Sequence, residues 1–139
     1  MASPTTDALV QLSFVIQSRL SDLASSRDLS LTQLRMLGVL RDRRPTMQDL
    51  AGHLGLTKSS LTGLIDRAEQ RSLVVRTPDA SDGRTVRVEL TELGRSLAAE
   101  GTVAMNDAMD ALLEPLSASD RKVLHRVAVR LAEAGQEQA

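Results

Sequence analysis

A chain of 139 residues with 42% apolar and 25% charged residues has the composition of one soluble domain, with room for helical extensions. It contains no cysteine, which excludes disulfides, thiolate zinc sites and thiol redox switches, and its only aromatic residue is Phe14, which excludes an aromatic platform for stacking single-stranded nucleic acid. Residues 1–7 lack the basic region followed by an apolar run that is typical of a signal peptide, and no stretch approaches the roughly 18 apolar residues of a membrane helix. We therefore expect a soluble, cytoplasmic protein with no membrane partner.

The formal net charge of −1 conceals an uneven distribution. Residues 41–87 contain nine basic and six acidic residues, whereas the rest of the chain contains eight basic and twelve acidic residues. A basic centre between acidic flanks is expected when only the centre meets phosphate. The imbalance is small and also arises by chance, so it is compatible with nucleic-acid binding without establishing it.

Two helices are predicted before Pro45. The first, over residues 7–24, has one apolar stripe formed by Leu9, Leu12, Ile16, Leu20 and Leu23. Ser30 and Gln33 form a capping-box pattern that opens the second helix. This helix ends in the charged residues 41–44, because a proline disfavours helix at the residue before it.

Two shorter helices follow with a tight connection. Thr46 is placed to cap the first of them, and Gly55 ends it because glycine tolerates a left-handed conformation. Thr57 then caps a helix over residues 58–71. Two short helices joined in this way predict a helix-turn-helix, whose second helix is the candidate for contact with DNA.

The outward face of that second helix begins with small hydrogen-bond donors. A helix N-terminus attracts phosphate through its free N–H groups and its dipole, and short hydroxyl side chains allow close approach to base edges. The structural alternative is simple capping, which we assign to Thr57. A glycine on this face either lets DNA approach the backbone or accommodates a neighbouring element. The candidate DNA-binding residues here are Lys58, Ser59, Ser60, Thr62, Gly63 and Arg67.

The next segment predicts a β-hairpin. Apolar and polar residues alternate around Leu73 and Val75, and again around Val86, Val88 and Leu90, as in two half-buried strands. The residues between them are turn formers. A hairpin this small needs a helical body beneath it.

Asp82 and Arg84 lie at the tip of this hairpin. A protruding guanidinium suits a narrow minor groove, because such grooves concentrate negative potential. The alternative is a solvent-exposed hairpin whose charged residues only keep it soluble, and the hairpin alone does not decide between these two interpretations.

Two helices complete the predicted set. Thr91 caps a long helix that Pro115 ends, and Ser117 opens a last helix that carries further apolar residues. The apolar stripes of the terminal helices have little within one small monomer to bury them. This surplus of apolar surface indicates dimerisation.

A helix-turn-helix followed directly by a hairpin is the winged-helix arrangement, and here the sequence resembles the MarR family of transcription regulators. The matching stretches are QDLAGHLGL (48–56), LTGLIDRAE (61–69) and DGRTVRVELTELG (82–94). The last contains the family's Asp-x-Arg wing motif and the Leu-Thr-x-x-Gly motif after it. The order of six helices matches over nearly the whole chain.

The resemblance implies a mainly α fold with a small β-wing, made of six helices and a two- to three-stranded antiparallel hairpin. It implies segments 1–29 and 92–139 for dimerisation and 30–91 for DNA binding. The resemblance also implies a homodimer, with Leu9, Leu12, Ile16, Leu20, Val123, Val127 and Leu131 as interface candidates.

On a pseudo-palindromic operator, such a dimer places its fourth helices in major grooves and its wings in minor grooves. The resemblance implies that Arg84 enters the minor groove and that Asp82 orients it through a charged pair. Arg76 and Arg87 of the hairpin complete the candidate DNA-binding residues. Family members usually repress genes, and many release DNA when a small anionic or aromatic effector binds.

Two other classes of function remain open. An enzyme would use His53 or His125, but neither has a nucleophile at motif spacing, so we expect no catalytic site, metal or cofactor. A winged-helix module for protein assembly, or an architectural DNA binder without an effector, is the stronger alternative. No effector-binding residue is predicted: Arg19 and Arg35 could pair with a carboxylate, but solvated arginines fit the pattern as well.

Overall fold

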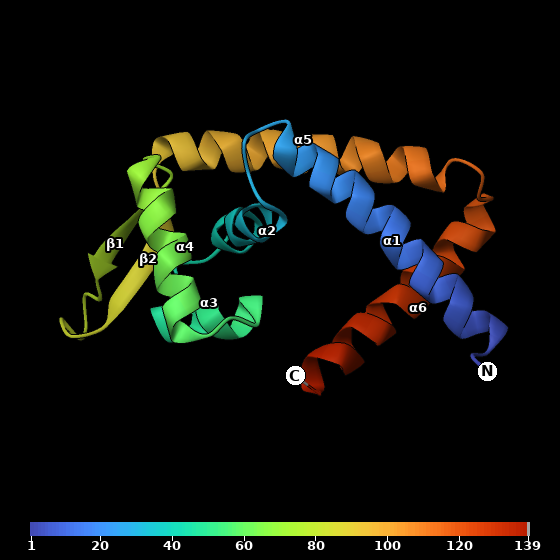
Figure 1. Cartoon of the computed structure of the whole chain (residues 1–139), viewed down its shortest axis with the longest axis horizontal. Coiled ribbons are helices and arrows are strands. Elements are labelled where there is room, and N and C mark those ends of the chain that lie inside the picture. Colours follow the sequence, from blue (N-terminus) through green and yellow to red (C-terminus); the bar gives the residue numbers. More distant parts are fainter. Residues whose placement is uncertain (139) are drawn as a thin grey trace. The chain divides into compact units, whose positions relative to one another are not determined.

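The computed structural model describes residues 1–138, and these form six helices and a two-stranded antiparallel sheet (Figure 1). The elements in chain order are α1 (Pro4–Ser25), α2 (Leu31–Leu40), α3 (Met47–Leu54), α4 (Lys58–Gln70), β1 (Val74–Pro78), β2 (Val86–Leu90), α5 (Glu92–Leu113) and α6 (Ala118–Glu137). The predicted mainly α fold with a hairpin is confirmed. The chain separates into two compact units, with their boundary after Met105, inside α5. The predicted division into segments 1–29, 30–91 and 92–139 stays a prediction.

Hydroxyl side chains begin the helices, as the sequence predicts for all of them except α1. In each case the hydroxyl oxygen accepts a hydrogen bond from the backbone N–H three residues further on, which satisfies one of the free N–H groups of the first turn. The capping residues are Ser3, Ser30, Thr46, Thr57 and Ser117. The capping box of α2 is complete. Helix α1 begins before residue 7, the predicted start, because Pro4 occupies its first turn, where proline is favourable.

Gly55 ends α3 in the left-handed region, with a φ of 64°, as predicted. The turn that follows leads into α4, and α3 packs against both α2 and α4. Leu50 of α3 and the α4 residues Leu61 and Ile65 are fully buried in the core that these helices share. The far end of α4 is anchored too, because the Arg71 guanidinium donates hydrogen bonds to backbone carbonyls of the turn between α1 and α2. Both ends of α4 are therefore held.

The two strands pair with Val74 opposite Leu90 and Pro78 opposite Val86. The described residues form no third strand. A single antiparallel bridge joins Thr46 to β2 at the place where a third strand would pair. The predicted strand faces are partly wrong, because Val74 is buried in place of Val75, and Val75 and Val86 are exposed. Register is the reason: residues on one face of β1 are those opposite Leu90 and Val88, which fall at Val74 and Arg76.

Helix α5 starts against the preceding sheet. The Thr91 hydroxyl donates to the Ser72 carbonyl at 2.6 Å and accepts from the Gly94 N–H at 3.0 Å, while the Thr91 N–H donates to the Leu73 carbonyl at 3.0 Å. Gly94 is buried and touches the Leu73 carbonyl, leaving no space for a Cβ. These contacts explain the Leu-Thr-x-x-Gly motif: the threonine caps α5, and the glycine lets it pack on the segment before β1.

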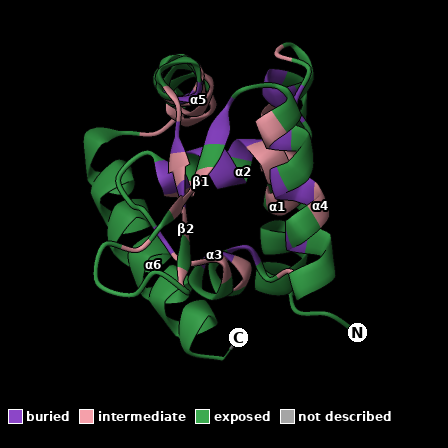
Figure 2. Ribbon diagram, turned by 90° about the vertical axis from the view of Figure 1, so that its left-hand side faces the viewer, coloured by how far each residue is buried: buried purple, intermediate pink, exposed green. Residues whose placement is uncertain are grey.

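The hydrophobic core lies among α2, α3, α4 and the two strands, with the C-terminal end of α1 and the beginning of α5 closing it (Figure 2). The long helices contribute little else. In α1 only Leu23 and Ala24 are buried, and α6 buries no residue. Large apolar side chains therefore stay exposed on these helices, including Leu9, Phe14, Val127 and Leu131.

Candidate nucleic-acid interface

The N-terminal turn of α4 is open to solvent. Thr57 caps it by accepting a hydrogen bond from the Ser60 N–H at 3.2 Å, which confirms the capping role predicted for this threonine. Thr57, Lys58, Ser59 and Thr62 line a shallow hollow at this end of the helix. Because the free N–H groups and the helix dipole favour negative charge here, the hollow suits a phosphate or the edge of a base.

Thr62, Gly63 and Arg67 continue this surface along α4. The Thr62 hydroxyl donates to the Lys58 carbonyl at 2.9 Å, so its oxygen can serve an outside partner only as an acceptor. A Cβ added to Gly63 would lie 3.2 Å from Arg67 Nη1, which places the guanidinium of Arg67 over the glycine. A Cβ at Gly63 would therefore require the flexible Arg67 side chain to shift slightly, and the DNA contact predicted for Gly63 stays a prediction.

Arg76 ties the hairpin to α4. Its guanidinium forms an ion pair with Asp66 at 2.9 Å and a second ion pair with Glu69. Both carboxylates belong to α4, three residues apart, and therefore lie on one side of the helix. The structure therefore gives Arg76 a positioning role, and its contact with DNA stays a prediction.

Arg87 holds the end of the hairpin that lies next to its loop in a similar way. Its Nε donates to the Asp79 carboxylate at 2.9 Å, and its Nη1 donates to the Arg44 carbonyl at 2.8 Å, in the linker between α2 and α3. Hydrogen bonds from the Ser81 N–H and the Ser81 hydroxyl, and then from Arg87, hold the pKa of the Asp79 carboxyl below its usual range. Arg87 therefore supports the hairpin, as Arg76 does, and its contact with DNA stays a prediction.

Asp82 shapes the tip of the hairpin, which corrects one expectation. Its carboxylate accepts from the backbone N–H of Arg84 at 3.0 Å and from the Thr85 hydroxyl at 3.0 Å, and not from the Arg84 guanidinium. A short acidic side chain at a turn reaches the N–H two residues on more readily than the end of a long side chain. Asp82 therefore orders the backbone that carries Arg84.

Arg84 is exposed, and its guanidinium has no hydrogen bond or ion pair with any of residues 1–138. The arginines of the two strands are held by carboxylates, whereas the arginine of the tip is available to an outside partner. A protruding guanidinium on an ordered turn can bind phosphates or enter a negatively charged groove.

The described residues contain no group of three or more histidine, cysteine or acidic side chains that could hold a metal ion. None of the helices in this part of the chain is long and apolar enough to cross a membrane. His53 is bonded to Arg43 Nη1 at 3.2 Å, and His125 lies on the exposed helix α6.

Residues 27–85 match the model of the MarR family. The transcriptional regulator FarR of Neisseria gonorrhoeae is 27% identical over 125 residues, which cover 89% of this chain and 86% of FarR. The transcriptional repressor NicR of Pseudomonas putida is 36% identical over 75 residues, covering 53% and 48%. The crystal structure of NadR in complex with 4-hydroxyphenylacetate superposes with a TM-score of 0.77 at 26% identity, covering 94% of each chain.

Over residues 27–85, which hold its helix-turn-helix and the first strand of its wing, the chain belongs to the MarR family. It is a DNA-binding transcriptional regulator of the winged helix-turn-helix type, in a family of regulators and not of enzymes. Helices α3 and α4 form the helix-turn-helix, and residues 74–90 form the wing.

Sequence reasoning missed the partners that hold this MarR wing in place. Asp66, Glu69 and Asp79 were not assigned, although each turns out to pair with an arginine of the wing. A signal was present for α4, because two acidic residues at helical spacing precede an arginine on the next strand. The structure brings Lys58, Ser59 and Thr62 together but gives Arg76 and Arg87 internal partners.

Proposed function

We propose that this MarR-family protein acts as a homodimeric repressor that binds a pseudo-palindromic operator and releases it when a small ligand binds. Each protomer inserts the N-terminal half of α4 into a major groove and the tip of its wing into the neighbouring minor groove. The two α4 helices of a dimer then read half-sites separated by about one helical turn.

The main observation that supports this proposal is the difference among the arginines of the wing. Arg76 and Arg87 form ion pairs with internal carboxylates, whereas the guanidinium of Arg84 has no partner among residues 1–138. A charge kept unpaired at the tip of an ordered turn supports a role in binding an anionic partner. The open, hydroxyl-rich start of α4 offers the second contact surface.

The exposed apolar side chains of the long helices support a homodimer. Leu9 is 53% exposed on α1, and Leu131 is 54% exposed on α6. Soluble proteins rarely leave so many large apolar side chains in water without a partner. A second copy of the chain is the partner that a twofold operator requires.

Repression and ligand release are supported by the relatives. NicR is named a repressor, and NadR was crystallised with an aromatic carboxylate. This chain has no tyrosine or tryptophan, and Phe14 is its single aromatic side chain, so charged and aliphatic side chains would supply most of the contacts to such a ligand.

The proposal is tested by selecting binding sites from random double-stranded DNA with the purified protein, and by sedimentation of the protein with and without the selected site. We expect an inverted repeat, a preference over random DNA of about 10³-fold or more, and two protomers on each site. Equal affinity for all sequences would support an architectural role instead, and no affinity at low salt would support an assembly module.

Charged substitutions on the apolar face of α6 test whether operator binding depends on the dimer. Val127→Glu and Leu131→Glu on α6 are expected to give folded monomers that lose operator binding. Lys122→Glu, an exposed charge reversal on the same helix, is the control and should leave the dimer intact. A monomeric variant that keeps full operator affinity would contradict the proposed dimer.

A further inference from the structure

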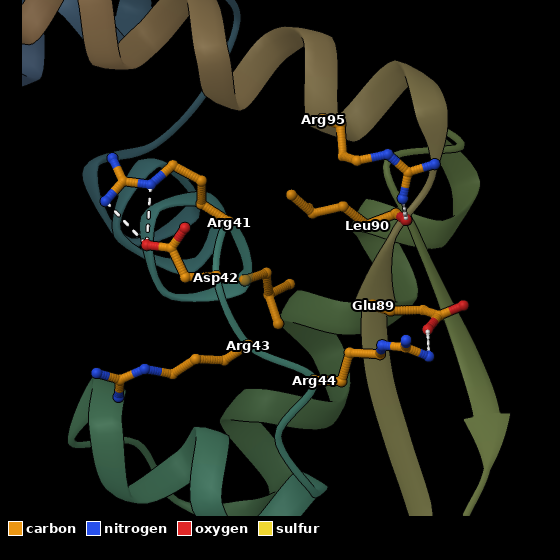
Figure 3. A pocket seen from close by; sticks show the side chains of 8 residues that line it. Arg41, Asp42, Arg43, Arg44, Glu89, Leu90 and Arg95 are labelled. Carbon is orange, nitrogen blue, oxygen red and sulfur yellow. Dashed lines mark hydrogen bonds and ion pairs between the residues drawn. The ribbon is translucent and has the colours of Figure 1, made fainter.

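A hollow rich in arginine lies on the winged-helix lobe, away from the residues that line the start of α4 (Figure 3). It has a volume of about 530 Å³ and lies between the end of α2, the linker from α2 to α3, the end of β2 and the start of α5. Four arginines and only two carboxylates line it, so it carries an excess of positive charge. The arginines are Arg41, Arg43, Arg44 and Arg95.

Each guanidinium keeps donors that the protein does not use. Arg44 makes one hydrogen bond, at 3.2 Å, to Glu89, and Arg95 makes one, at 2.9 Å, to the carbonyl of Leu90. Within residues 1–138, the Arg43 guanidinium is hydrogen-bonded to Nε2 of His53, at 3.2 Å. Since an arginine has five N–H donors, most of those around the hollow are free for a ligand.

The fourth arginine is the best held. Arg41 forms two hydrogen bonds with the Asp42 carboxylate, at 3.1 and 3.0 Å, and a third with the Thr102 hydroxyl at 3.2 Å. Asp42 forms an ion pair with Arg41, and Glu89 forms one with Arg44. The uncompensated positive charge therefore belongs mainly to Arg43 and Arg95 and to the free donors of Arg44.

The guanidinium groups lie around the rim and not at one point, and Leu90 lies between them (Figure 3). A single small ion such as chloride would meet at most one or two of them at once. A ligand with a flat apolar body would cover Leu40 and Leu90 while its anionic groups reached separate arginines.

We propose that this hollow is the binding site for a small organic polyanion, with an apolar body and two or three carboxylate or phosphate groups. As an effector site it rests on the proposed function, but its ligand binding can be measured without DNA. The site is connected to the wing, because the Arg44 carbonyl accepts the hydrogen bond from Arg87 that supports β2. Glu89, the partner of the Arg44 side chain, belongs to the same strand.

The test is isothermal titration of the full-length protein, without DNA, using benzene-1,3,5-tricarboxylate as the probe. The double variant Arg44→Gln/Arg95→Gln is expected to weaken binding by about tenfold or more, since it removes two charge-assisted contacts. Arg126→Gln, on the exposed surface of α6, is the matched control and should bind as the wild type does. Benzoate, with the same ring and one charge, should bind more weakly than the probe.

Three results would overturn the proposal. Tricarboxylate binding that the double variant leaves unchanged would place the ligand elsewhere, and loss of binding in Arg126→Gln alone would place it near that residue. No measurable binding of the probe, together with a smaller salt dependence of DNA binding in the double variant, would assign the arginines to DNA phosphates. Thermal unfolding of each variant shows whether a loss of binding reflects a loss of fold, and Arg44→Lys/Arg95→Lys, which keeps the charge, should recover part of the affinity.

Discussion

Gly94 of α5 touches the backbone carbonyl of Leu73, the residue before β1. A Cβ built at Gly94 would lie 3.0 Å from the Leu73 carbonyl carbon and would overlap the carbonyl oxygen. Since the obstacle is backbone, it cannot turn aside as the end of a side chain can. This contact fixes where α5 leaves the winged-helix lobe.

We therefore predict that Gly94→Ala destabilises the protein by about 2–4 kcal/mol, in the range for overpacked or strained core positions. Chemical denaturation measures the change. Gly38→Ala is the matched control, because Gly38 is an exposed position of α2 with no atom within 4 Å of an added Cβ. That control should gain up to about 1 kcal/mol from helix propensity. Equal stability of the two variants would contradict the role assigned to Gly94.

Arg84 should contribute to DNA affinity and not to folding. Arg84→Ala is expected to weaken operator binding by about 1–3 kcal/mol, because the substitution removes a contact with DNA and no hydrogen bond or ion pair that the guanidinium makes within residues 1–138. Fluorescence anisotropy at fixed salt measures the affinity, with thermal unfolding as the check on folding. Arg35→Ala, which replaces an exposed arginine of α2, should bind operator as the wild type does.

Asp82 should act through the conformation of the tip. Asp82→Ala removes the acceptor for the Arg84 N–H and the Thr85 hydroxyl, so the turn becomes more mobile and Arg84 binds DNA at a higher entropic cost. We expect a smaller loss of affinity than for Arg84→Ala, and almost no further loss when both residues are replaced. Additive losses would mean that Asp82 contacts DNA independently of Arg84.

Arg76 and Lys58 should respond differently to salt. Arg76→Ala should lower the stability of the lobe by about 1 kcal/mol or less, since the two ion pairs are partly exposed, and leave the salt slope of DNA binding almost unchanged. Lys58→Ala should leave stability unchanged and reduce the slope by about one unit. A reduced slope for Arg76→Ala would restore Arg76 to the DNA contacts.

Asp79 should make stability depend on acid pH. Its pKa is lower in the folded than in the unfolded chain, so its contribution to the free energy of unfolding is complete above the unfolded pKa and is lost as the pH falls through the folded one. Urea unfolding of wild type and Asp79→Asn should therefore show a constant difference near neutral pH that shrinks in strong acid. A difference that stays constant into strong acid would contradict this.

The local part of the fold could be predicted from the sequence, because capping hydroxyls and Gly55 act within a few residues. Ser30, Thr46 and Thr57 each begin the helix they predict. Properties that depend on pairing between segments were not predicted. Val74 is buried in place of the predicted Val75 because of the register of the two strands. The alternation of Leu73 and Val75 within one strand does not determine that register.

The candidate site likewise has a local part, which the sequence predicted, and a part that depends on tertiary packing, which it did not. The start of α4 was predicted because a helix N-terminus is defined by its own residues. The partners of Arg76 and Arg87 were missed because they depend on how the wing packs on α4 and on the linker before α3. The hollow of four arginines joins residues about 50 positions apart, and no spacing rule links Arg44 with Arg95.

The central claim is that α4 and Arg84 contact DNA in neighbouring grooves of one half-site. Hydroxyl-radical footprinting of the selected operator, with wild type and Arg84→Ala at saturating protein, tests it most directly. The account predicts two symmetric sets of protected sites, with the outer minor-groove windows lost in the variant and the inner protections kept. An identical footprint for both proteins would contradict it.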